Sequence, residues 1–114
     1  MNEWVLVEVD DIPEQGGKGL ELATPGGEGR SIFIVRKEGK LYAYLNRCPH
    51  TGVGLEWMPN EFFDYDRNYI QCAMHGALFA VEDGLCLRGP CIGQHLQPLA
   101  LEVRREGCFV NIGA

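Results

Sequence analysis

The sequence predicts a single all-β domain, built as an antiparallel β-sandwich or small barrel. Short runs rich in β-branched and aromatic residues recur along the 114 residues, and long amphipathic helical patterns are not seen. The 15 glycines and 6 prolines supply frequent turn signals between those runs. Several short strands at close turn spacing are typical of sandwiches and small barrels, and this length suits one domain with one core.

The expected strands can be placed in order along the chain. The first covers Trp4 to Val9, which is rich in β-branched residues and alternates in part. Residues 31–45 predict a hairpin, because two apolar runs flank a turn in which Gly39 can take a positive φ. The other expected strand segments are 68–72, 77–87 with a turn at Asp83-Gly84, and 99–113 with a turn at Glu106-Gly107, while 13–19 and 24–29 are expected to be surface loops.

Charge and cysteine content restrict the function. The formal net charge of −6 disfavours nucleic-acid binding and suits docking onto a basic protein surface. The N-terminal sequence has neither a basic region nor a long apolar run, so we expect a cytoplasmic protein that does not enter a membrane. Five cysteines in that compartment favour metal ligation over a disulfide framework.

Two segments each join one cysteine to one histidine at the end of an expected strand. The first contains Cys48-x-His50 and the second Cys72-x-x-His75, and glycines follow both motifs. Thiolate and imidazole ligands suit either zinc or a [2Fe–2S] cluster. Zinc sites usually pair cysteine with cysteine and histidine with histidine, so the mixed pairing favours a cluster with two metal centres.

These motifs resemble those of Rieske-type [2Fe–2S] proteins, and most closely the small soluble Rieske ferredoxins. The likeness includes "CPHTG" in the first loop, "HGALF" in the second and "RGP" (88–90), where the family places a proline loop over the cluster. The resemblance implies that Cys48 and Cys72 bind one iron and that His50 and His75 bind the other. It also implies a cluster-binding part at about 46–91 and a base formed by 1–45 and 92–114, with a segment 51–71 longer than in most small ferredoxins.

Residues beside the ligands bear on the reduction potential. Gly52 and Gly76 are expected to let backbone N–H groups approach the cluster, and Pro90 to cover it. High-potential relatives carry a serine after the His-Gly pair, where this chain has Ala77, and a disulfide where it has Val53 and Met74. We therefore expect a potential near the low end of the Rieske range of about −150 to +300 mV.

The resemblance implies a one-electron carrier, not an enzyme, which accepts electrons from a flavin reductase and passes them to a terminal oxygenase. Nicotinamide, flavin and nucleophile motifs are not found, and His95 alone remains once the two ligand histidines are assigned. The alternatives are a small Rieske subunit of a nitrite reductase, a redox protein with another partner, and, in a different class, a structural zinc module.

The remaining candidate residues have ordinary structural explanations. His95 is expected at the surface, and Cys108 in the core. Cys86 and Cys91 flank "LRGP" and are expected to be buried thiols, although they could approach closely enough to pair. The aromatic and acidic segment 56–68 is expected to pack over the domain, with a partner-docking surface as the alternative.

Overall fold

The computed structural model describes residues 3–23, 29–47, 49, 55, 60–72 and 76–112. Ten β-strands and no helix occur in these ranges, and all paired strands run antiparallel. The predicted all-β antiparallel architecture is therefore confirmed. Within the same ranges, no helix is long and apolar enough to span a membrane.

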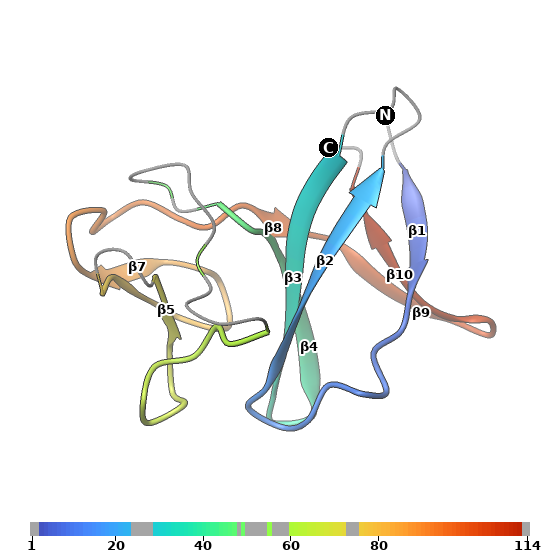
Figure 1. Cartoon of the computed structure of the whole chain (residues 1–114), viewed down its shortest axis with the longest axis horizontal. Coiled ribbons are helices and arrows are strands. Elements are labelled where there is room, and N and C mark those ends of the chain that lie inside the picture. The colour runs from blue at the N-terminus through green and yellow to red at the C-terminus, as the bar shows by residue number, and fades with distance from the viewer. Residues whose placement is uncertain are drawn as a thin grey trace.

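The strands form three sheets, which Figure 1 shows side by side with the β2–β3–β4 sheet in the middle. One end sheet has the order β1-β10-β9, the middle sheet β2-β3-β4-β8, and the other end sheet β5-β6-β7. The bounds are β1 Trp4–Val7, β2 Gly17–Ala23, β3 Gly29–Lys37, β4 Lys40–Leu45, β5 Ile70–Gln71, β6 Leu78–Phe79, β7 Cys86–Arg88, β8 Pro98–Leu99, β9 Leu101–Arg104 and β10 Gly107–Asn111.

The predicted hairpin of residues 31–45 is present as β3 and β4. Its turn residues Glu38 and Gly39 both have positive φ angles, 53° and 76°, which is the geometry of a tight two-residue hairpin turn. The expected turn at Gly84 is also confirmed, with φ +75°, and so is the hairpin of β9 and β10, where Gly107 has φ +140°.

The loop predicted at 13–19 is wrong in part, because Gly17, Lys18 and Gly19 belong to β2. This strand pairs with β3 along its whole length, from Gly17 opposite Val35 to Ala23 opposite Gly29. A Cβ on Gly17 would lie 2.9 Å from the Phe62 ring, so glycine serves close packing here and not a turn. The loop expected at 24–29 is one residue too long, because residue 29 starts β3; 24–28 lie outside the described residues.

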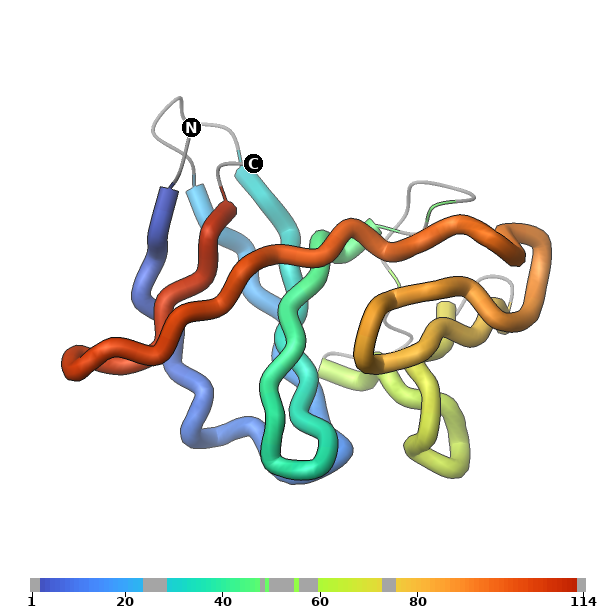
Figure 2. Tube along the Cα trace, turned by 180° about the vertical axis from the view of Figure 1, so that it is seen from behind, coloured from blue at the N-terminus to red at the C-terminus, as the bar shows by residue number. Residues whose placement is uncertain are grey.

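Strand β3 separates two hydrophobic cores, because alternate side chains of a strand point to opposite faces. Phe33 and Val35 face the core on the β5–β6–β7 side, and Ile32 and Ile34 face the core on the β1–β10 side. All four side chains are fully buried. After β7 the chain runs back along the molecule to β9, as the orange tube in Figure 2 shows, and β8 pairs with β4 on the way.

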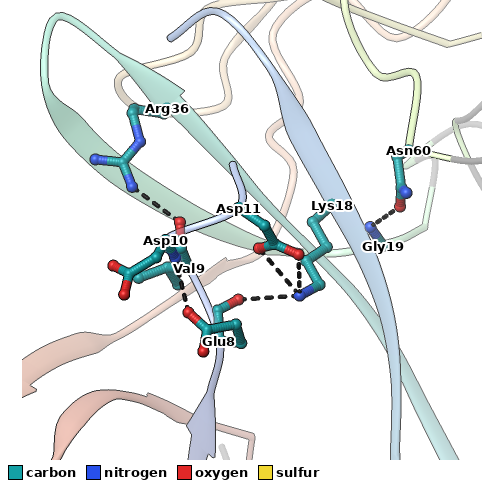
Figure 3. Close-up of polar contacts among 8 residues, drawn as sticks. All are labelled: Glu8, Val9, Asp10, Asp11, Lys18, Gly19, Arg36 and Asn60. Carbon is teal, nitrogen blue, oxygen red and sulfur yellow. Dashed lines mark hydrogen bonds and ion pairs between the residues drawn. The ribbon is translucent and has the colours of Figure 1, made fainter. Parts of the chain in front are cut away.

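Side chains of β2 and β3 fix the long connection between β1 and β2 (Figure 3). Lys18 Nζ donates to both carboxylate oxygens of Asp11, at 2.9 and 3.2 Å, and to the Glu8 carbonyl at 3.2 Å. Arg36 Nη2 donates to the Val9 carbonyl at 3.0 Å. The hydrogen bond from Lys18 lowers the pKa of the Asp11 carboxyl.

Candidate metal centre

The second ligand motif begins at Cys72, the predicted ligand that lies within the described residues. Cys72 directly follows β5, and its side chain is fully buried in the core that also contains Phe79 and Leu55. Cys48, His50, His75 and Gly52 lie outside the described residues. Their assignment as ligands, or as a neighbour of the ligands, therefore stays a prediction.

Backbone hydrogen bonds close the loop that carries the second motif. The Cys72 N–H donates to the Ala77 carbonyl at 2.9 Å, and the Gly76 N–H donates to the Cys72 carbonyl at 2.9 Å. Gly76 has φ +65°, and a Cβ there would meet only Gln71 Nε2, at 3.8 Å. Glycine is thus favoured at this position by the backbone conformation of the closed turn.

A side chain that the sequence analysis did not single out lies two residues before the first motif. Asn46 is largely buried just after β4, and its Oδ1 accepts a hydrogen bond of 2.9 Å from the buried Leu55 N–H. The Asn46 N–H in turn donates to the Ser31 carbonyl of β3 at 2.8 Å. Asn46 therefore links Leu55 to the middle sheet. The sequence feature that could have identified Asn46 is a polar residue between an expected strand and the Cys-x-His motif.

The segment "RGP" packs directly on the second ligand loop. A Cβ on Gly89, which has φ +109°, would lie 2.9 Å from both the Cα and the Cβ of Ala77. Ala77 is fully buried, whereas Pro90 is exposed on the outer side of the segment. The structure thus brings Gly89 against Ala77, whose carbonyl accepts the hydrogen bond from Cys72, and the covering of a cluster by Pro90 stays a prediction.

The other cysteines and the remaining histidine occupy different surroundings. Cys86 and Cys91 are buried in the same core as Cys72, with their sulfur atoms 2.8 Å apart. Cys108 is buried in the other core, where burial raises the pKa of its thiol. His95 is exposed, with Nδ1 3.5 Å from the Asp83 carbonyl oxygen. The predictions for Cys108 and His95 are confirmed.

The described part of the segment 56–68 packs onto the domain through its aromatic residues. Phe62 is fully buried and stacks on Phe33 of β3, with ring centroids 4.4 Å apart. Just before it, Asn60 Oδ1 accepts a 2.8 Å hydrogen bond from the Gly19 N–H of β2, as Figure 3 shows. Tyr65 departs from this pattern, because 98% of its surface is exposed. Trp57 lies outside the described residues.

A buried tyrosine links β4 to the chain that follows β6, the strand after the second ligand motif. Tyr44 of β4 donates its hydroxyl proton to the Val81 carbonyl at 2.5 Å. Burial, with smaller effects of Asp83, Tyr42 and Glu82, raises the pKa of the Tyr44 phenol well above its ordinary value. Tyr44 therefore stays a hydrogen-bond donor at any physiological pH and links β4 to the segment that follows β6.

The fold defines a class of protein: an antiparallel β domain in which the two predicted ligand motifs follow the strands β4 and β5. The chain matches the Rieske [2Fe-2S] domain family over residues 3–104 and belongs to that family. Membership implies one Rieske-type [2Fe–2S] cluster. The family and the cofactor predicted from the sequence are therefore confirmed.

Known proteins similar to this chain include components of carbazole 1,9a-dioxygenase. Its terminal oxygenase component from a Sphingomonas species is 38% identical over 56 residues, which are 49% of this chain and 14% of that protein. The Novosphingobium sp. KA1 terminal oxygenase has a TM-score of 0.78 at 21% identity, with 99% of this chain and 30% of that chain covered. The Nocardioides aromaticivorans IC177 ferredoxin has a TM-score of 0.65 at 19% identity, with 93% and 92% covered.

These likenesses differ in what they cover. The chain spans 14% of the curated oxygenase, 30% of the Novosphingobium oxygenase chain and 28% of a chain in a complex of oxygenase and ferredoxin. At 19–21% identity, the two structural likenesses establish a shared fold. The likeness to a chain in a complex between oxygenase and ferredoxin of carbazole 1,9a-dioxygenase is 27% identical, with a TM-score of 0.74 over 96% of this chain.

Proposed function

We propose that this chain is a one-electron carrier that takes electrons from a flavin reductase and passes them to a terminal oxygenase. The observation that carries the proposal is the Rieske family match over residues 3–104. Support comes from the fold that the chain shares with an oxygenase and a ferredoxin of two carbazole 1,9a-dioxygenase systems. On this proposal the chain performs no catalysis of its own and works in the cytoplasm.

The described residues fit a bound cluster. Cys72 supplies a thiolate, the soft ligand that iron–sulfur clusters require, from a position that the core shields from water. We assign Cys48 and Cys72 to one iron and His50 and His75 to the other, as the motifs predict. When bound, the cluster supplies reversible one-electron oxidation and reduction at a potential raised by histidine ligation.

The protein itself contributes a rigid setting for the ligands. Asn46 binds the Leu55 N–H on the far side of the first motif, and hydrogen bonds from Cys72 to Ala77 and from Gly76 to Cys72 close the second loop. Gly89 packs against Ala77, whose side chain is fully buried. A site that is held in one arrangement in both oxidation states reorganises little, which favours fast electron transfer.

Spectroscopy and potentiometry of the purified protein test the cofactor. We expect a red-brown protein that gives the EPR signal of a mixed-ligand [2Fe–2S] cluster after reduction by dithionite. Colourless, EPR-silent protein with stoichiometric zinc would contradict the cluster, and a midpoint clearly above about +100 mV would contradict the low-potential assignment. His75→Cys should lower the midpoint if that residue is a ligand, since thiolate adds negative charge.

Stopped-flow electron transfer tests the role as a carrier. The dithionite-reduced protein, freed of dithionite, is mixed with the oxidised terminal oxygenase of a carbazole 1,9a-dioxygenase system. The expected result is oxidation of the carrier in step with reduction of the oxygenase, and loss of both in Cys72→Ser. An intact cluster that exchanges no electrons with either this oxygenase or its reductase would refute the proposed partners and leave the cofactor assignment standing.

A further inference from the structure

Cys86 and Cys91 form a close sulfur pair that the proposed function does not use. Cys91 Sγ donates to Cys86 Sγ at 2.8 Å, and Cys86 Sγ also lies 3.4 Å from the Arg88 carbonyl oxygen. The backbone holds both residues in place, because the Cys86 N–H donates to the Gln94 carbonyl at 2.8 Å and the Gln94 N–H to the Cys91 carbonyl at 2.9 Å. The fold thus fixes the two sulfurs beside each other.

We propose that Cys86 and Cys91 are an oxidation site, which forms an intramolecular disulfide when the protein meets a hydroperoxide. A disulfide needs the sulfurs about 2.05 Å apart, so the observed contact must shorten by less than about 1 Å. Both side chains are buried, but the next residues along the chain, Leu87 and Ile92, are 46% and 67% exposed, so the segment that carries the pair lies at the surface. Local opening of this segment admits a small oxidant.

The reaction balances with a hydroperoxide as the oxidant. The thiolate of one cysteine attacks the peroxide, the O–O bond breaks, and a sulfenic acid and one molecule of alcohol or water result. The second thiol then attacks the sulfenic sulfur, the S–O bond breaks, and the departing hydroxide takes the thiol proton and leaves as water. Two electrons pass from the two thiols to the peroxide. A dithiol reductant later reduces the disulfide back to the two thiols.

The disulfide would tie the two ends of the segment 87–90. This segment includes Gly89, which packs on Ala77 of the second ligand loop. Closing the ring at Cys86 and Cys91 removes conformations in which the segment lifts away, because a crosslink restricts the open state more than the closed one. Oxidation therefore holds the segment against Ala77, and it does so without consuming Cys72.

Peptide mapping of the full-length holoprotein after hydrogen peroxide treatment tests the proposal. Peroxide is raised until either the Cys86–Cys91 pair or Cys108 no longer reacts with an alkylating agent, and the protein is digested with trypsin without reduction. The expected product is peptide 68–88 linked to peptide 89–104, lost on treatment with dithiothreitol. Fragmentation must place the link at Cys86, since Cys72 lies in the same peptide.

Variants and native-state proteolysis complete the test. Cys108→Ala should keep the linked peptide and Cys86→Ala should lose it. Oxidation should slow trypsin cleavage of the native wild-type chain after Arg88 by about tenfold, because cleavage requires local opening of the segment. A link through Cys72, earlier oxidation of Cys108, sulfinic acid at Cys86 or Cys91 without a link, or unchanged cleavage of the linked form would each overturn the proposal.

Discussion

Alanine substitutions at Gly89 and Gly93 can measure how closely the segment 88–90 packs against Ala77. Both have positive φ angles, +109° and +90°, so alanine at either position brings backbone strain of about 1–3 kcal/mol. At Gly93 a Cβ would meet nothing within 4 Å. At Gly89 it would lie 2.9 Å from the Cα and Cβ of Ala77, atoms that no side-chain rotation can move aside.

Gly89→Ala should therefore destabilise the protein more than Gly93→Ala, by the cost of overpacking alone. That cost is about 1–3 kcal/mol, and with a urea dependence of about 1–3 kcal/mol/M it separates the two unfolding midpoints by about 1 M. The assay is urea unfolding followed by tryptophan fluorescence, with visible absorbance of the holoprotein reporting the cluster. Equal midpoints for the two variants would refute the close contact between Gly89 and Ala77.

Three further substitutions test the supports of the ligand loops. Asn46→Ala should lower the free energy of unfolding in urea by about 1–3 kcal/mol, because it leaves the buried Leu55 N–H without its acceptor. The surface control Asn68→Ala should change it by less than about 0.5 kcal/mol. Ala77→Ser should raise the midpoint potential measured by voltammetry, because a hydroxyl adds a hydrogen-bond donor beside the ligand loop; an unchanged potential would contradict this. Tyr44→Phe should cost about 1 kcal/mol at neutral pH. Since the folded-state pKa of Tyr44 is raised, the wild type should lose this advantage as pH rises above the unfolded value of about 10, which unfolding at pH 7 and above pH 10 can check.

Local sequence signals predicted the elements whose geometry is local. The hairpin of β3 and β4 follows from two apolar runs and a glycine in the turn, and both features act within fifteen residues of chain. Strand β2 could not be predicted in the same way, because Gly17 and Gly19 are usual in loops. Its strand conformation results from pairing with β3 and from the close approach of Phe62, which is distant in sequence.

Residues of the candidate site also differ in whether local sequence or distant contacts define their roles. Cys72 and Gly76 could be proposed from the sequence because the ligand type and the turn glycine lie within one short motif, and their role at a cluster stays a prediction. Asn46 and Gly89 could not be assigned their roles, since these depend on contacts with Leu55 and Ala77 that only the folded chain creates. The spacing of Cys86 and Cys91 allowed a close approach, and the 2.8 Å contact comes from the backbone pairing around them.

The position of β3 between the two cores has a consequence for cooperativity. Phe33 and Val35 belong to the core that holds Cys72, and Ile32 and Ile34 belong to the core that holds Cys108. The two faces of β3 thus belong to different cores, so unfolding of β3 would expose both cores to solvent. Cluster binding therefore stabilises the sheet of β1, β10 and β9 as well, because β3 couples the two cores.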